Sequence, residues 1–148
     1  MAAWEAGSAT NLNLMCCPLC RYDRDSRDHL FFQCSFSAEV WNIVKKIVDM
    51  GSVSDTWNSI TMWMEQHSNS KKLNHTVCKM VVAASTYFIW QERNNRLFSQ
   101  TRRSANTISQ VIIRTVRLRL MGFHVGREPR YKELLERWKI PMKNTLGD

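Results

Sequence analysis

The stretch Cys17-Pro-Leu-Cys20, followed by His29-Leu-Phe-Phe-Gln-Cys34, spells the pattern Cys-x2-Cys-x8-His-x4-Cys. Thiolate and imidazole groups are the ligands that zinc prefers, and four of them arranged as a tetrahedron complete a structural site. Pro18 favours the tight turn that brings the first two thiols together, because its ring fixes φ. The spacing therefore predicts one structural zinc ion. Its expected ligands are Cys17, Cys20, His29 and Cys34.

The first ligand of this set has two candidates. Cys16 could replace Cys17, because a Cys-x3-Cys spacing to Cys20 is also feasible, although the x2 turn is the commoner one. The other interpretation is a reduced protein whose cysteines are simply buried. A disulfide framework is disfavoured by the odd number of cysteines, 5, and by the lack of a secretory signal. The remaining histidines are expected to be ordinary surface or core residues: His67, His75 and His124.

Apolar residues recur at helical spacing through most of the sequence that follows the Cys/His pattern. The first expected helix ends at Gly51, and the second lies between Ser54 and the polar run 67–72. The third spans about 74–98, and the fourth runs from Ser104 to about 121. The last lies between Pro129 and Pro141. Serines are the expected N-caps, with Ser35 or Ser37 before the first helix. The helix over 74–98 is apolar on more than one face and should be the most buried.

These patterns predict a mainly α fold. A small Cys-Cys-His-Cys zinc knuckle over residues 1–36 should be followed by a bundle of about five helices over residues 37–148, with both parts packed as a single structural unit. The longest apolar run, 80–90, is interrupted by Ser85 and Thr86 and is too short to cross a bilayer, so no membrane partner is expected. The lack of a secretory signal predicts an intracellular protein, nuclear or cytoplasmic.

The net charge of +8 is distributed unevenly along the chain. Residues 1–70 carry 5 basic and 8 acidic side chains, whereas residues 71–148 carry 16 basic and 5 acidic ones. A concentrated positive field favours polyanionic partners, of which nucleic acid is the usual one. The alternative is a solvated cationic face that only aids solubility. The candidates for phosphate contacts are Lys71, Lys72, Arg93, Arg96, Arg102, Arg103, Arg114 and Arg117.

The chain resembles the zinc-binding domain found near the C-terminus of the reverse-transcriptase polyproteins of plant non-LTR (LINE-type) retrotransposons. The resemblance rests on Cys17-Pro-Leu-Cys20, Ser26-Arg-Asp-His29-Leu-Phe-Phe-Gln-Cys34, Phe36-Ser, Val40-Trp41 and Ile89-Trp-Gln-Glu-Arg-Asn-Asn-Arg-Leu-Phe98. It covers about residues 4–140. The resemblance implies zinc ligation by the same four residues. It also implies an accessory role in a nucleic-acid-handling enzyme, such as gripping template RNA or target DNA.

The resemblance does not imply catalysis by this chain. The Tyr-x-Asp-Asp motif of the family's polymerase is absent, and so is a spaced carboxylate set like that of RNase H. Asp23, Asp25 and Asp28 cluster between the ligand pairs, but each lies beside an arginine, which indicates a solvated mixed-charge loop. The chain begins where an internal methionine of such a polyprotein could fall. We therefore expect a truncated or stand-alone retrotransposon-derived reading frame that is not itself an enzyme.

Two functions remain open on the sequence. The first is a zinc-stabilised module that binds RNA or DNA non-specifically through basic helices, because phosphate contacts give affinity without sequence choice. Phe31 and Phe32 could then stack on unpaired bases, or could instead pack beneath the zinc. The second is a structural or protein-interaction module whose partner is another part of the polyprotein or a host protein. Its 6 Trp and 8 Met residues would allow sizeable apolar surfaces.

Overall fold

The computed structural model describes residues 16–48, 50, 53, 56–122, 133 and 136–138. Within these residues the protein is mainly α-helical, as the sequence predicts, and extended pairing is limited to one antiparallel bridge between Cys16 and Arg24. The elements in chain order are the π-helical turn η1 (His29–Gln33), α2 (Ser35–Lys45), α3 (Trp57–Gln66), α4 (Leu73–Asn94), the π-helical turn η2 (Asn95–Ser99) and α5 (Ala105–Met121).

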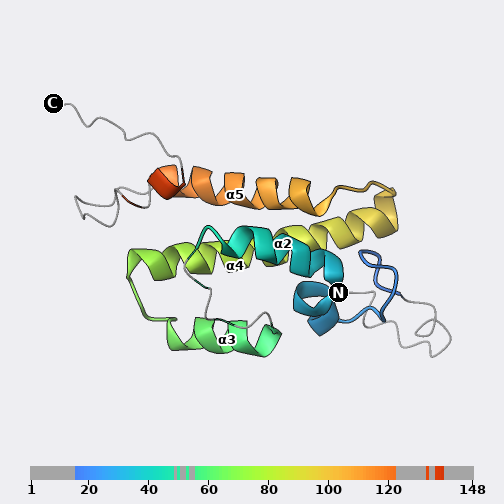
Figure 1. Ribbon diagram of the computed structural model, residues 1–148, viewed down its shortest axis with the longest axis horizontal. Coiled ribbons are helices and arrows are strands. Elements are labelled where there is room, and N and C mark those ends of the chain that lie inside the picture. Colours follow the sequence, from blue (N-terminus) through green and yellow to red (C-terminus); the bar gives the residue numbers. More distant parts are fainter. Residues whose placement is uncertain are drawn as a thin grey trace.

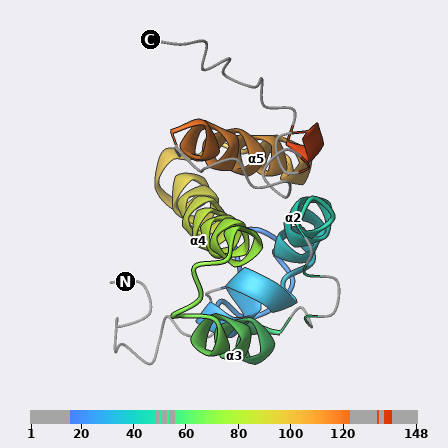
Figure 2. The same cartoon turned by 90° about the vertical axis from the view of Figure 1, so that its left-hand side faces the viewer.

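Helix α4 is the central element of the structure. It forms an antiparallel hairpin with α5, and α2 packs against both of them (Figure 1). Helix α3 lies on the side of α4 opposite to α5, as both Figure 1 and Figure 2 show. The turn η1 contacts α2 and α4, so the Cys/His segment lies at the end of the hairpin where α4 turns into α5.

The apolar core lies where α2, α4 and α5 meet. Side chains at helical spacing from each element are buried there: Val40, Trp41 and Val44 from α2, Val77, Val81 and Ile89 from α4, and Ile108, Ile112 and Val116 from α5. Helix α4 also buries Cys78, Val82 and Ser85 on a second flank, which confirms that it is buried on more than one face. Burying each large apolar side chain contributes roughly 1.5–3 kcal/mol.

The helix ends follow the expected capping rules only in part. Ser104 caps α5 as predicted, because its Oγ accepts a hydrogen bond from the Thr107 N–H at 3.1 Å. The prediction of Ser35 or Ser37 as the cap of α2 is wrong, since the extended residue Cys34 precedes the helix. Ser37 is instead fully buried and donates to the carbonyl of Leu30, which ties η1 to α2.

The remaining predicted ends differ in detail. Helix α3 is capped by Thr56, which accepts a hydrogen bond from the Ser59 N–H at 3.2 Å, while Ser54 lies outside the described residues. Helix α4 ends at Asn94, and the expected continuation to residue 98 is the widened turn η2. No helix in the described part of the chain combines the length and apolarity that crossing a membrane requires.

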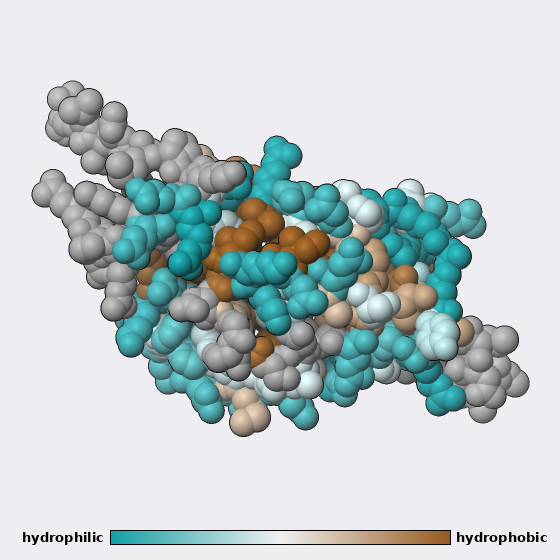
Figure 3. All heavy atoms as spheres, viewed as in Figure 1, coloured by the Kyte–Doolittle hydropathy of each residue, from teal (hydrophilic) through white to brown (hydrophobic). Residues whose placement is uncertain are grey.

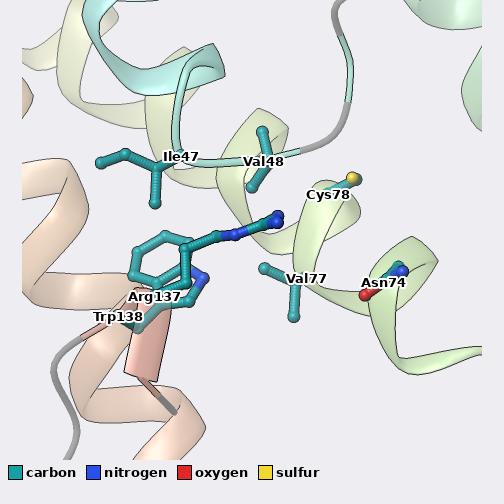
Figure 4. A pocket seen from close by; sticks show the side chains of 7 residues that line it. All are labelled: Ile47, Val48, Asn74, Val77, Cys78, Arg137 and Trp138. Carbon is teal, nitrogen blue, oxygen red and sulfur yellow. The ribbon is translucent and has the colours of Figure 1, made fainter. Parts of the chain in front are cut away.

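The last predicted helix falls mostly outside the described residues, although Glu133, Glu136 and Arg137 are helical. Trp138 is almost fully buried and closes a small crevice between the end of α2 and the first turns of α4 (Figure 4). Arg137 and Cys78 also line this crevice. The C-terminal region therefore contributes one large anchor to the helical core.

A buried network of charged groups fixes the passage from α4 to α5. Glu92 is fully buried and its carboxylate accepts hydrogen bonds from Arg96 Nε at 3.1 Å, from the Arg103 N–H at 2.7 Å and from Arg103 Nε at 3.0 Å. A buried carboxylate is tolerated when it is paired and hydrogen-bonded in this way. Glu92 therefore holds η2 and the residues before α5 against the end of α4.

The same network reaches the N-terminal segment. The Arg96 guanidinium donates to the carbonyls of Pro18 at 3.4 Å and Leu19 at 3.0 Å, and it lies 4.5 Å above the ring of Phe36. Arg93 donates to both carboxylate oxygens of Asp25, at 3.2 Å from its Nε. The hydrogen bonds join residues 68 to 78 positions apart and hold the Cys/His segment against α4 and η2.

Replacing Glu92 by Gln keeps the shape of the side chain and removes its charge. Arg96 and Arg103 would then lose their buried counter-ion, and breaking a buried pair typically costs about 3–5 kcal/mol. We expect the urea midpoint of E92Q to fall by the equivalent of about 3 kcal/mol. The control is E39Q, at an exposed glutamate of α2, which should change stability by less than about 0.5 kcal/mol. Equal midpoints for E92Q and the wild type would contradict a stabilising network.

Candidate metal centre

Four side chains that are spread over 18 residues of sequence converge at one point. The potential ligand atoms of Cys17, Cys20, His29 and Cys34 all lie within 4.8 Å of one another. The two sulfurs of Cys17 and Cys34 are 3.8 Å apart, and Cys20 Sγ lies 3.3 Å from His29 Nε2. With metal–sulfur bonds of about 2.3 Å and metal–nitrogen bonds of about 2.0 Å, a tetrahedron has S–S edges of about 3.8 Å and S–N edges of about 3.5 Å. The cluster therefore has the dimensions of a four-coordinate metal site.

The first ligand pair is held by a tight turn. The Arg21 N–H donates to the Cys17 carbonyl at 2.8 Å, and the Cys17 N–H donates to the Asp23 carbonyl at 2.8 Å. Arg21 adopts a left-handed φ of 59°, which reverses the chain immediately after Cys20. The backbone thus points both thiols toward the same side of the turn, as the x2 spacing predicts.

The second ligand pair depends on the π-helical turn η1. Cys34 follows His29 by five positions, and in an α-helix residues five apart point in different directions, because each residue rotates by about 100°. In η1 the Cys34 N–H donates to the His29 carbonyl at 2.6 Å, which is the wider i→i+5 closure. The wider turn brings the two side chains back to one side. The x4 spacing of this pair is therefore satisfied by an irregular helix.

The thiols of Cys17 and Cys34 are electrostatically coupled. The hydrogen bond from Cys17 lowers the pKa of Cys34 to about 5 in spite of burial, and the backbone N–H groups of Ser37 and Phe36 at the start of α2 act in the same direction. The same hydrogen bond, together with burial, raises the pKa of Cys17. The lowered pKa of Cys34 favours the thiolate that binds a metal ion, and a bound cation would also favour loss of the proton from Cys17.

The imidazole of His29 is oriented by contacts on both of its nitrogens. Its Nε2 faces Cys20, while its Nδ1 lies 3.9 Å from a carboxylate oxygen of Asp23. Metal-binding histidines commonly direct the second ring nitrogen toward a carboxylate or a carbonyl, which fixes the tautomer. Nε2 is thus the ligand atom. Asp23, which the sequence suggested only as part of a solvated loop, lies on the Nδ1 side of the ring, at a distance beyond a direct hydrogen bond.

The structure decides between the two candidate first ligands. Cys17 is fully buried within the cluster, whereas Cys16 is exposed. Cys78 is buried in α4 and lies outside the cluster. Because all four positions of the tetrahedron are filled by protein donors, no position is left open for water or substrate, as in structural rather than catalytic metal sites.

The structure describes the side chain of only one of the two phenylalanines that lie between His29 and Cys34. Phe31 is 8% exposed and belongs to the apolar core. The hypothesis that Phe31 stacks on bases is therefore wrong, because its ring is enclosed by protein, and the alternative of packing near the metal cluster holds. The side chain of Phe32 lies outside what the structure describes.

The eight basic residues proposed for phosphate contacts fall into two groups. Arg93 and Arg96 have side chains only 3% and 9% exposed, and Arg103 is ion-paired with Glu92. The prediction that these three arginines contact phosphates is wrong, because their guanidinium groups bind Asp25, Glu92 and main-chain carbonyls. Lys71, Lys72, Arg102 and Arg114 are exposed, and Arg117 is half-buried. Hydrophilic side chains surround a smaller apolar area on the face shown in Figure 3.

One residue pair was not anticipated from the sequence. The rings of His67 and His75 meet at 4.3 Å between centroids, and Trp63 stacks on His67 at 4.4 Å. His67 Nδ1 donates to the Trp63 carbonyl at 2.8 Å, and His75 Nδ1 lies 2.7 Å from Ser70 Oγ. These contacts hold the corner between α3 and α4. The contact between the two histidines could not be predicted from the sequence, because it depends on how the chain reverses after residue 67.

The choice of Cys17 over Cys16 gives a direct test. We expect one metal ion per chain in the wild type and in Cys16→Ser, measured by elemental analysis of the purified protein. Cys17→Ser should retain none, because a buried serine hydroxyl is a poor replacement for a thiolate ligand. The opposite pattern would show that Cys16 is the ligand.

The contact between Asp23 and His29 gives a second test. Removal of a carboxylate that supports a ligand histidine typically weakens metal binding by about 10–100-fold. We expect Asp23→Asn to weaken metal affinity within this range in a competition titration against a chromophoric chelator. Asp28→Asn, at an exposed aspartate of the same loop, is the matched control and should leave the affinity unchanged.

Comparison with known proteins does not assign this chain to a family. No family model matches the sequence, and no match was found among curated proteins or solved structures. Function must therefore be inferred from the geometry of the Cys/His cluster and from the charge of the helices.

Proposed function

We propose that this protein is a zinc-stabilised module that binds RNA or DNA without sequence preference and carries no catalytic activity of its own. Zinc fits the cluster because three thiolates and one imidazole form one of its usual structural ligand sets. Binding of structural zinc contributes about 10–16 kcal/mol in zinc-finger peptides, which is far more than a short segment gains from packing. The ion would hold residues 17–34 in the conformation that docks on α4.

The observation that carries the nucleic-acid proposal is the one-sided charge of the α4–α5 hairpin. Residues 71–122 contain 10 basic side chains and a single carboxylate, Glu92. Because Glu92 is fully buried, the surface of this fully described stretch presents no carboxylate to solvent. A positively charged surface attracts polyanions at long range, and this attraction weakens as the salt concentration rises.

The proposed phosphate contacts are the predicted residues that remain outside the buried network: Lys71, Lys72, Arg102, Arg114 and Arg117. Helices α4 and α5 are antiparallel, so Lys71 and Lys72, which precede α4, lie toward the same end of the hairpin as the C-terminal half of α5. Arg114 and Arg117 belong to that half. A polynucleotide following this surface would meet these charges in succession.

The resemblance to the zinc-binding domain of LINE-type reverse-transcriptase polyproteins supports the same proposal. The Cys-x2-Cys-x8-His-x4-Cys spacing and the His-Leu-Phe-Phe-Gln-Cys segment are its most specific elements. On this proposal the chain derives from a retrotransposon polyprotein and keeps an accessory role of gripping nucleic acid. A different ancestry would leave the proposals for zinc and nucleic acid unchanged, because they rest on the ligand geometry and the surface charge.

The zinc proposal is tested by elemental analysis and by metal removal. We expect one zinc ion per chain after expression in a medium that also supplies iron, cobalt and nickel. Chelation should then speed hydrogen exchange over residues 17–34, because the segment loses one of its two anchors, while the amides in the middle of α4 stay protected. Another metal at full occupancy would contradict the assignment of zinc.

The nucleic-acid proposal is tested by the salt dependence of binding. Each lost phosphate contact should lower the slope of log K against log salt by about 0.9 on duplex DNA, or about 0.7 on a single strand. We expect this change for Arg114→Gln, measured by fluorescence anisotropy. Lys46→Gln, which neutralises an exposed charge at the end of α2, should leave the slope unchanged.

The triple variant of Lys71→Gln, Lys72→Gln and Arg114→Gln should lose affinity in proportion to the lost contacts. If it binds like the wild type at every salt concentration, the hairpin is not the contact surface.

The second candidate function, a protein-interaction module, is favoured by large apolar side chains that are exposed on three helices: Met62, Tyr87 and Leu118. Concentration-dependent self-association without nucleic-acid retention would support it.

A further inference from the structure

At the end of the molecule where α4 turns into α5, the usual distribution of charged and apolar side chains is reversed. Charged side chains are buried there, as Glu92 and Arg93 show, while aromatic side chains face solvent. Phe98 in η2 is 77% exposed, and Tyr22 in the knuckle loop is 87% exposed. Leu97, beside Phe98, is also exposed. Tyr22 and Phe98 are the most exposed large apolar side chains of the described residues.

The buried network explains why these aromatics point outward. The side chain of Arg96 is turned inward to Glu92 and to the carbonyls of Pro18 and Leu19. The next residues of η2, Leu97 and Phe98, have no part in this network and are exposed. Gln100 then takes a left-handed φ of 53° as the chain reverses toward α5.

The same contacts bring Tyr22 to this end of the molecule. Because Arg96 binds the carbonyls of Pro18 and Leu19, the turn that holds the first two ligand cysteines lies directly against η2. Tyr22 follows that turn by two residues, and Phe98 follows Arg96 by two residues. Figure 1 shows the knuckle loop beside the junction of α4 and α5.

The surroundings of the two rings favour a negatively charged partner that offers flat apolar faces. Arg21 precedes Tyr22 and Arg102 follows Phe98 by four residues, and both arginines are exposed. Asp23, beside Tyr22, is also exposed, but Arg24 and Arg27 in the same loop outweigh it, and no carboxylate occurs between residues 93 and 122. Unpaired nucleobases joined by phosphates match both properties, since bases stack on aromatic rings and phosphates bind arginine. A duplex does not match, because its bases already stack on one another.

We propose that Tyr22 and Phe98 form a stacking platform for unpaired bases of a single-stranded nucleic acid, with Arg21 and Arg102 contacting the neighbouring phosphates. The proposal rests on the proposed function and deepens it, because it distinguishes single strands from duplexes. The α4–α5 hairpin then supplies affinity for any polyanion, whereas the platform supplies the preference for exposed bases. Stacking does not read the sugar, so ribose and deoxyribose strands should bind alike.

Three probes of equal length separate stacking from electrostatics: an oligothymidine of about 12 nucleotides, an abasic strand with the same phosphates, and a duplex. We expect the wild type to bind oligothymidine at least about tenfold more tightly than the abasic strand, since each stacked base contributes appreciably. The double variant of Tyr22→Ala and Phe98→Ala should lose this preference. Its binding to the abasic strand and the duplex should stay within about twofold of the wild type.

Matched variants control for folding and for apolarity. Phe98→Trp should keep the preference and Phe98→Leu should lose most of it, because only the former retains an aromatic face. Tyr87→Ala, at an exposed aromatic residue of α4, should bind all three probes like the wild type. Oligouridine should give the same pattern as oligothymidine.

The outcomes that overturn the platform differ from those that overturn the proposed function. Equal wild-type binding to oligothymidine and the abasic strand, or an equal loss on all three probes in the double variant, overturns the platform alone. Absence of binding to any probe at low salt overturns the proposed function as well. If Phe98→Ala instead dissociates an oligomer in sedimentation and leaves strand binding unchanged, the surface is a protein contact and the platform is excluded.

Discussion

The carboxylate of Glu92 is the group on which the arrangement of the Cys/His segment and of the turn between α4 and α5 depends. A carboxylate without exposure to water requires compensating donors, and here they come from Arg96 and Arg103, which flank the turn between α4 and α5. Orienting Arg96 toward Glu92 places its other donors at the carbonyls of Pro18 and Leu19. The turn that carries two metal ligands is therefore positioned by a charge on a distant helix.

This coupling gives the Cys/His segment two independent anchors. One is the network of Arg93 and Arg96, which holds the loop from outside the cluster. The other is the cluster itself, in which Cys34 is both a candidate ligand and the N-cap residue of α2. A metal ion bound there would fix the origin of α2 and, through Ser37, the turn η1. Metal binding and helix packing would then stabilise each other, because both restrain the same few residues.

Several local features could be predicted from the sequence, although the cap of α2 could not, and the long-range contacts could not be predicted at all. The ligand set, the cap at Ser104 and the enclosure of α4 follow from spacings of a few residues, and the structure has all three. The roles of Arg93 and Arg96 could not be predicted, because their partners lie 68 to 78 residues away. A sequence shows that a residue is charged but does not show which buried group it faces. The approach of Asp23 to His29 was also not predicted, although the two residues are close in sequence, because it depends on how the loop between the ligand pairs folds.

The chemistry of arginine accounts for how one basic stretch can serve two purposes. Every basic residue between positions 93 and 119 is an arginine. Arg96 donates to a carboxylate and to three main-chain carbonyls while its flat face covers Phe36, which a lysine with one donor nitrogen could not do. The same planar, permanently charged group suits phosphates and base stacks where it is exposed, as at Arg102 and Arg114. Burial, rather than residue type, separates the arginines that build this fold from those available to a partner.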